Sequence, residues 1–234
     1  MSDNPQALRD QIARMVHYQQ DSRSVSFEVH EALTRDGYTR QRITYKAADG
    51  DTIPAYLLLP DGNGPFPAIL AHHQHAGQRH FGKSEVIGLV GDPLQAFGPA
   101  LAQRGVVVLA PDSICFEDRR RNRSGTEPAE DEDGLQHYRE LGERLTLGQS
   151  LMGKVLSDAS SAIAILMQQP QVDAARVGLL GHSYGGNTVL FQMAVDARIA
   201  FAVSSGALCS YAHKRVNDIA LEMALIIPSF AALF

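Results

Sequence analysis

A serine between two glycines is the feature of this sequence whose residue types and spacing point most directly to chemistry. Residues 181–185 read Gly-His-Ser-Tyr-Gly, a G-x-S-x-G pattern with Ser183 at its centre. The apolar run 177–180 precedes it and a helical pattern follows, which is the strand–turn–helix context that a nucleophilic serine requires. In this turn Gly181 and Gly185 allow the strand and the helix to approach each other closely. The pattern predicts a nucleophilic hydroxyl at the positive end of a helix; the alternative is a glycine-rich turn in which Ser183 only caps the helix.

Four histidines close together in the sequence suggest a different chemistry. His72, His73, His75 and His80 carry imidazoles, which are common ligands of zinc. On a strand, His73 and His75 would share a face while His72 points away. No cysteine or carboxylate with an established ligand spacing accompanies them, so we expect no metal and expect these histidines to shape a pocket or to bond within their loop.

The elements that must position these residues follow from the hydrophobic pattern. The later apolar runs do not alternate with polar residues, which is typical of strands buried on both faces. Helical segments separate these runs, so repeated β-α-β units are predicted, with a mostly parallel central sheet and helices on both faces. The earlier strands alternate and surround a turn at 49–51, which predicts a hairpin. Strands are expected at 25–29, 42–45, 53–59, 68–71, 106–110, 177–180 and 200–203, and helices at 7–18, 94–103, 150–169 and 185–195.

Composition narrows the class of protein. The chain has 234 residues, of which 44% are hydrophobic and 20% charged, which suits one α/β domain over 1–234 with an N-terminal helix in 1–20. Its net charge of −5 gives no electrostatic reason to bind nucleic acid or an anionic membrane. Cys115 and Cys209 are too few for a disulfide framework, and two buried thiols are expected. The polar N-terminus lacks a signal-peptide pattern, so a cytoplasmic location is expected.

Three segments together resemble a known family. Residues 67–77, 105–112 and 177–186 resemble, in the same order, the α/β-hydrolases of the dienelactone hydrolase and acetyl xylan esterase-like group. The resemblance extends over about residues 40–227. It implies the α/β-hydrolase fold and hydrolysis of small acyl esters or lactones through an acyl-enzyme on Ser183, with no cofactor.

The resemblance also implies an oxyanion hole. One donor would be the backbone amide of Tyr184, which follows the nucleophile. The second would come from the loop at 71–77, where the amides of Gln74 and His75 are the candidates.

The acid and base of the expected triad are harder to place. In this fold the triad runs serine, then acid, then histidine, and His213 is the one histidine after His182. Asp196 precedes a strand and should lie at the opposite edge of the sheet, so it is a poor acid. His213 follows that strand and is the stand-in base, with Asp218 or Glu222 behind it. His182 is excluded for steric reasons.

The simplest explanation is that the last strands of the fold are missing from this chain, either by truncation or in a shortened variant. Strand 200–203 would then be an exposed edge, which favours a homo-oligomer. A catalytically impaired protein that acts by binding or oligomerisation is therefore the alternative to an esterase.

Two segments follow the carboxyl ends of strands and are expected to cover the pocket, namely 113–147 and 207–227. Tyr138, Phe116 and Tyr211 are the candidate lining residues. Within the first segment, the basic run 119–123 beside acidic residues at 127–133 is expected to be a solvated loop.

Overall fold

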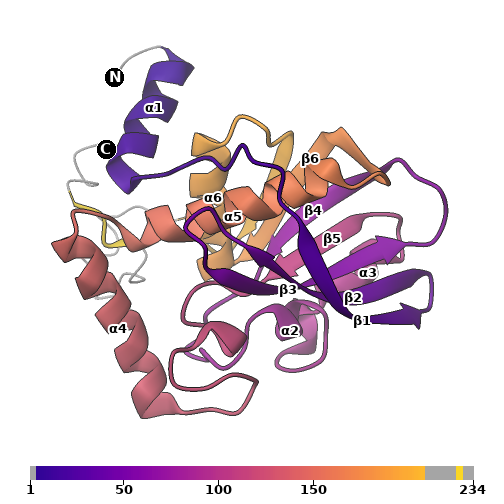
Figure 1. Cartoon of the computed structure of the whole chain (residues 1–234), viewed down its shortest axis with the longest axis horizontal. Helices are drawn as coiled ribbons and strands as arrows, with labels where there is room; N and C mark the ends of the chain where they lie inside the picture. The colour runs from indigo at the N-terminus through magenta and orange to yellow at the C-terminus, as the bar shows by residue number, and fades with distance from the viewer. Residues whose placement is uncertain (1–3, 209–224, 229–234) are drawn as a thin grey trace.

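A seven-stranded mixed sheet forms the centre of the molecule (Figure 1). The computed structural model describes residues 4–208 and 225–228. The order of the strands in the sheet is β1-β2-β3-β5-β4-β6-β7. Their bounds are β1 Phe27–Arg35, β2 Tyr38–Lys46, β3 Thr52–Pro60, β4 Phe66–His72, β5 Val107–Pro111, β6 Val172–His182 and β7 Phe201–Ser205.

Strand directions divide the sheet into two parts. β1, β2, β3 and β5 pair antiparallel in succession. β5, β4, β6 and β7 pair parallel, with Leu70 opposite Leu109 on one side and Leu179 on the other. The predicted parallel β-α-β units and the hairpin around residues 49–51 are therefore confirmed. The carboxyl ends of the four parallel strands meet at one edge of the sheet, where the candidate catalytic residues lie.

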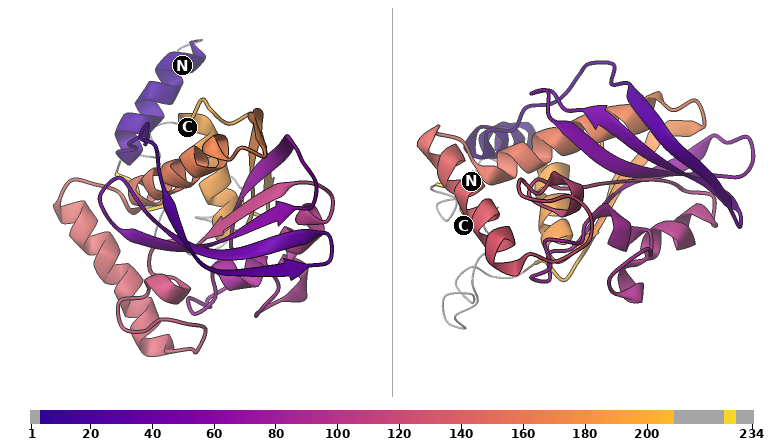
Figure 2. Two further views of the ribbon diagram at one scale, coloured as in Figure 1. Left: turned by 45° about the vertical axis from the view of Figure 1, so that its right-hand side comes forward. Right: turned by 60° about the horizontal axis from the view of Figure 1, so that its bottom comes forward.

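Helices cover both faces of the sheet, as the pattern predicts (Figure 2). α5 and α6 pack on one face, while α2 and α3 pack on the other. The expected helix at 94–103 is divided at Ala96 into a short 3₁₀ turn and α3. The helices are α1 Pro5–Val16, α2 Lys83–Val86, α3 Phe97–Ala102, α4 Glu130–Thr146, α5 Leu151–Gln168 and α6 Tyr184–Val195, and the 3₁₀ turns are η1 Pro93–Gln95 and η2 Glu117–Arg119.

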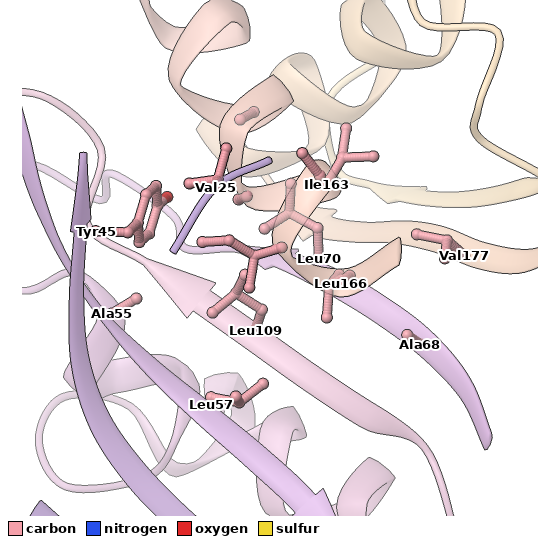
Figure 3. Packing of buried hydrophobic residues seen from close by; sticks show 14 of the residues in the cluster. Val25, Tyr45, Ala55, Leu57, Ala68, Leu70, Leu109, Ile163, Leu166 and Val177 are labelled. Carbon is pink, nitrogen blue, oxygen red and sulfur yellow. The ribbon is translucent and has the colours of Figure 1, made fainter. Parts of the chain in front are cut away.

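The main hydrophobic core lies between the sheet and α5 (Figure 3). Leu57, Leu70 and Leu109 come from three neighbouring strands, and Ile163 and Leu166 of α5 pack over them. Each of these five side chains is fully buried, and burying such a side chain stabilises the fold by about 1.5–3 kcal/mol. This core fixes the strands whose carboxyl ends carry the site.

The last strand in the described order leaves apolar side chains in contact with solvent. Phe201 and Val203 of β7 are 37% and 52% exposed. Within residues 4–208 and 225–228, no strand pairs with the outer side of β7.

The segment 113–147 differs from the solvated loop that its charges suggest. It contains η2 and the 17-residue helix α4. Arg119 and Arg120 are buried, because Arg119 pairs with Asp158 at 2.8 Å and Arg120 pairs with Asp133 at 2.8 Å. The solvated-loop interpretation is wrong for these two arginines, because each has a buried carboxylate partner that a sequence pattern does not show.

No single helix in the described ranges has the length and apolar character needed to cross a membrane. The bent pair formed by 131–146 and 151–168 meets those two criteria only when its members are taken together.

Candidate active site

Ser183 lies at a sharp turn between β6 and α6. Its backbone has φ 51° and ψ −115°, a conformation that residues other than glycine rarely adopt. Such strain persists only where the surroundings impose it, and it is common at functional sites. The Ser183 amide donates to the Ser205 carbonyl at 2.8 Å, and the Asn187 amide donates to the Ser183 carbonyl at 3.0 Å. These bonds hold the turn between β7 and the first turn of α6.

The two flanking glycines are required by close packing. A Cβ on Gly181 would lie 2.5 Å from the Gly185 carbonyl carbon. A Cβ on Gly185 would lie 2.7 Å from the His73 carbonyl oxygen and still closer to that of His72. The amino end of α6 therefore packs directly against the carboxyl end of β4. The Ser183 side chain makes no capping hydrogen bond to the helix, so the interpretation of this serine as a helix cap is wrong.

His73 is held as a neutral imidazole beside the turn. Its Nδ1 lies 2.8 Å from the Gln74 carbonyl oxygen, and its Nε2 lies 3.1 Å from the Ser113 amide. An amide can only donate, so Nε2 accepts and the proton resides on Nδ1, from which it is donated to Gln74. Burial lowers the pKa of His73 to about 4. Both ring nitrogens are thus occupied, Nδ1 within the loop and Nε2 by the segment after β5.

The loop that carries the predicted oxyanion donors is anchored from α2. Gln74 Nε2 donates to Glu85 Oε1 at 3.1 Å, and the same oxygen accepts from the Asp92 amide at 3.2 Å. The His75 ring lies 6.5 Å from the Tyr184 ring, between ring centroids. The structure thus brings Gln74, His75 and Tyr184 to the same edge of the sheet as Ser183. Their amides as oxyanion donors stay a prediction.

Aromatic rings form a wall beside the turn. Phe116 lies 5.3 Å from Tyr184 and 4.7 Å from His73, measured between ring centroids. The Tyr184 hydroxyl is 2.8 Å from Ser113 Oγ. On its far side, Phe116 contacts the buried imidazole of His137 from α4, with a centroid separation of 5.8 Å. The segment after β5 therefore lies beside the turn that carries Ser183. That 113–147 covers a substrate pocket stays a prediction.

A buried lysine holds this segment in place. Lys83 Nζ is 2.8 Å from Asp112 Oδ2 and 2.7 Å from Asp118 Oδ2, and it also pairs with Glu117. Burial opposes the charge on Lys83, but the three carboxylates outweigh it and raise the pKa of the amine. Burial and the charge of Glu117 raise the pKa of Asp112. Glu117 has a positive φ of 40°, so the network holds a strained backbone at the carboxyl edge of β5.

The same three carboxylates are the one group of potential metal ligands that meet within the described ranges. The ammonium of Lys83 already contacts all of them. The ring nitrogens of His72, His73, His75 and His80 do not gather into such a group. Those of His73 bond to Gln74 and Ser113.

The candidate acids and bases lie in different parts of the structure. The Asp196 carboxylate accepts from Arg198 Nη2 at 2.6 Å and from the Tyr18 hydroxyl at 2.7 Å, and it precedes β7. It therefore holds the amino edge of the sheet, as predicted. His182 Nδ1 lies 3.0 Å from Ser205 Oγ, directed toward β7, in agreement with its exclusion as the base. His213, Asp218 and Glu222 lie outside the described residues.

The predicted pocket residues are also divided. Phe116 is buried in the wall, whereas Tyr138 of α4 is 64% exposed. Cys115 is buried with a free thiol, and burial raises its pKa to about 11. Tyr211 and Cys209, like the rest of 209–224, lie outside the described part of the chain.

Sequence reasoning missed Lys83, Ser113 and His137. The one sequence signal near the lysine network was Asp112, which is the last residue of a segment with the family resemblance. Lys83 and His137 stand in stretches without a motif, and their burial depends on partners distant in the sequence.

Comparison with known proteins defines the class. The sequence model of the dienelactone hydrolase family matches residues 53–219. This chain belongs to that family and has the α/β-hydrolase fold. It is similar to the Bacillus subtilis (strain 168) protein named "Putative hydrolase YtaP", with 30% identity over 210 residues that make up 89% of this chain and 65% of that protein.

Solved structures with the same fold carry esterase names. One is described as a "putative acetyl xylan esterase" from Bacteroides fragilis NCTC 9343, with a TM-score of 0.78, 18% identity and coverage of 97% of this chain and 61% of that one. Another is acetyl xylan esterase 1 from Thermoanaerobacterium sp. JW/SL YS485, with a TM-score of 0.59, 19% identity and coverage of 99% and 67%. The chain therefore spans a little under two thirds of the length of YtaP and of the Bacteroides protein.

Proposed function

We propose that this protein is a serine-dependent carboxylic ester hydrolase. Ser183 Oγ attacks the ester carbonyl while a base accepts its proton, and the carbonyl oxygen becomes an oxyanion. The amides of Tyr184 and of Gln74 or His75 stabilise that charge. Collapse expels the alcohol and leaves an acyl-enzyme, which water then hydrolyses to the acid and free Ser183.

The observation that carries this proposal is the backbone of Ser183. A serine with positive φ, between two glycines that cannot carry a Cβ, costs stability without making a capping bond. The amino end of α6 lies directly after it, so helix amides and the helix dipole favour an anion next to the hydroxyl. These features support a nucleophile and have no evident structural use.

The substrate class is proposed from the family. Dienelactone hydrolases are named for a lactone, and the structural neighbours are named for acetyl esters of xylan. We therefore propose small acyl esters or lactones as substrates. His213 remains the proposed base, with Asp218 or Glu222 as the acid.

Labelling with a fluorophosphonate tests the nucleophile. We expect one adduct by intact mass, lost in Ser183→Ala and retained in Ser24→Ala, a serine that bonds Gln168 away from the turn. Turnover of a short acyl ester should follow the same pattern. Turnover that persists unchanged in Ser183→Ala would refute the proposal.

A non-catalytic protein that acts by binding or self-association is the second candidate. Its support is that, within 4–208 and 225–228, His73 and His182 use ring nitrogens for bonds to groups other than Ser183. A folded wild-type chain that neither takes the label nor hydrolyses short esters would favour this candidate.

A further inference from the structure

A small, partly open cavity lies beside the turn that carries Ser183. Its volume is about 20 Å³, and about 10–15 Å³ is enough to hold one water molecule. The carboxyl ends of β4 and β5, the first turn of α6 and the middle of α5 surround it. Its lining includes Tyr45, His72, Asp158, Tyr184 and Thr188.

Three of the lining side chains present buried polar atoms with unused hydrogen-bonding capacity. These atoms are Tyr45 Oη, His72 Nε2 and Asp158 Oδ2, and all three are buried. Asp158 Oδ2 accepts from Arg119 Nη2 at 2.8 Å, and a carboxylate oxygen can accept a second hydrogen bond. The three atoms come from β2, β4 and α5, and their side chains line the same cavity.

Leaving such atoms unpaired is unfavourable. A buried polar group without a partner costs about 1–3 kcal/mol, and buried groups of this kind are usually paired through an ordered water when there is room. The hydrogen-bonding capacities of the three atoms are complementary. Burial lowers the pKa of His72 to about 3 and raises that of Tyr45, so the imidazole is neutral and the phenol keeps its proton.

We propose that this cavity is a binding site for one structural water molecule. The water accepts a hydrogen bond from the Tyr45 hydroxyl, donates one to Asp158 Oδ2 and forms a third with His72 Nε2. This gives three hydrogen bonds, the usual number for a buried water. A metal cation is disfavoured because the guanidinium of Arg119 also lines the cavity and would repel it.

The site joins the outer, antiparallel part of the sheet to the catalytic edge. Tyr45 belongs to β2, whereas the carbonyl oxygen of His72 lies too close to Gly185 to leave room for a Cβ there. The water would therefore tie the end of β4, on which α6 rests, to α5 through Asp158. This role does not depend on whether Ser183 is a nucleophile.

A crystal structure at a resolution that orders internal waters provides the direct test. We expect one peak within hydrogen-bond distance of Tyr45 Oη, His72 Nε2 and Asp158 Oδ2. The absence of such a peak, in a map that shows other internal waters, would overturn the proposal. So would a peak with the short ligand distances of a metal ion.

Thermal unfolding of Tyr45→Phe gives an independent test, because the direction of the change in Tm depends on whether the water is bound. If the water is bound, the variant removes one of its bonds and lowers Tm by about 2–4 °C, the shift expected for a typical hydrogen bond in a chain of this size. If the cavity is dry, phenylalanine removes an unpaired hydroxyl and Tm is unchanged or rises, which would overturn the proposal. Tyr38→Phe is the matched control, because Tyr38 is also buried on β2 and its hydroxyl is not among the buried unpaired atoms.

Discussion

The imidazole of His137 should make the stability of this protein depend on pH. His137 lies on α4 with no exposed surface, and neither ring nitrogen has a hydrogen-bond partner. Burial is the main reason that its pKa falls to about 3, and the positive charge of Arg79 adds to the effect. In the unfolded chain a histidine titrates near 6.5. Replacing His137 with leucine removes this titration and keeps a side chain of similar size.

The sign follows from proton binding in the two states. Between pH 6.5 and about pH 3 the unfolded chain binds a proton at His137 and the folded chain does not. Above pH 6.5 the ionisation of His137 therefore does not reduce the free energy of unfolding. As the pH falls below 6.5, the free energy of unfolding decreases. At pH 5 the difference is about 1.5 pH units, which corresponds to about 2 kcal/mol.

Urea unfolding at pH 7.5 and pH 5.0 measures the contribution of His137 to the free energy of unfolding. We expect the wild type to lose about 2 kcal/mol more than His137→Leu between the two pH values. At pH 7.5 the variant should already be more stable by about 1–3 kcal/mol, because two unpaired buried nitrogens are removed. Leu141→Ala, a buried non-titrating position on the same helix, should be destabilised by about 2–5 kcal/mol at both pH values. Equal pH dependence of the wild type and His137→Leu would refute the reasoning.

Three further predictions address the turn, the lysine network and the exposed strand. Gly185→Ala places a Cβ 2.7 Å from the His73 carbonyl oxygen and should slow fluorophosphonate labelling by about 10²–10³-fold, the effect of losing an oxyanion donor; an unchanged rate in a folded variant would contradict it. Lys83→Met leaves three carboxylates without their cation and should reduce the free energy of unfolding by about 3–5 kcal/mol, measured by chemical denaturation. We propose that the protein self-associates through β7, so Val203→Lys should lower the mass measured by light scattering; a monomeric wild type would contradict this.

Much of the fold follows from short-range patterns. Unbroken apolar runs such as 68–71 and 106–110 predict buried parallel strands, and the separating helices predict the crossovers, because these preferences depend on neighbours within one element. The elbow is predicted for the same reason. Gly181, Ser183 and Gly185 lie within five residues, and the space they need is set by the strand and helix on either side.

The ionisation and burial of side chains depend on the tertiary structure. The basic run at 119–123 has the composition of a solvated loop, yet Arg119 is buried because Asp158 of α5 reaches it. Likewise, His72 and His73 are sequence neighbours that could bind a metal. The fold instead places His72 at the cavity and gives each ring nitrogen of His73 a partner within the protein.

The sequence by itself therefore determined the class of fold, the strand order along the chain and the position of the candidate nucleophile, since each rests on contacts within a few residues. The tertiary structure decided which charges are paired and which imidazoles stay neutral. Those outcomes depend on desolvation and on partners tens of residues away, as with Lys83 and the carboxylates of Asp112 and Glu117. A residue pattern shows neither the desolvation of a side chain nor its distant partners.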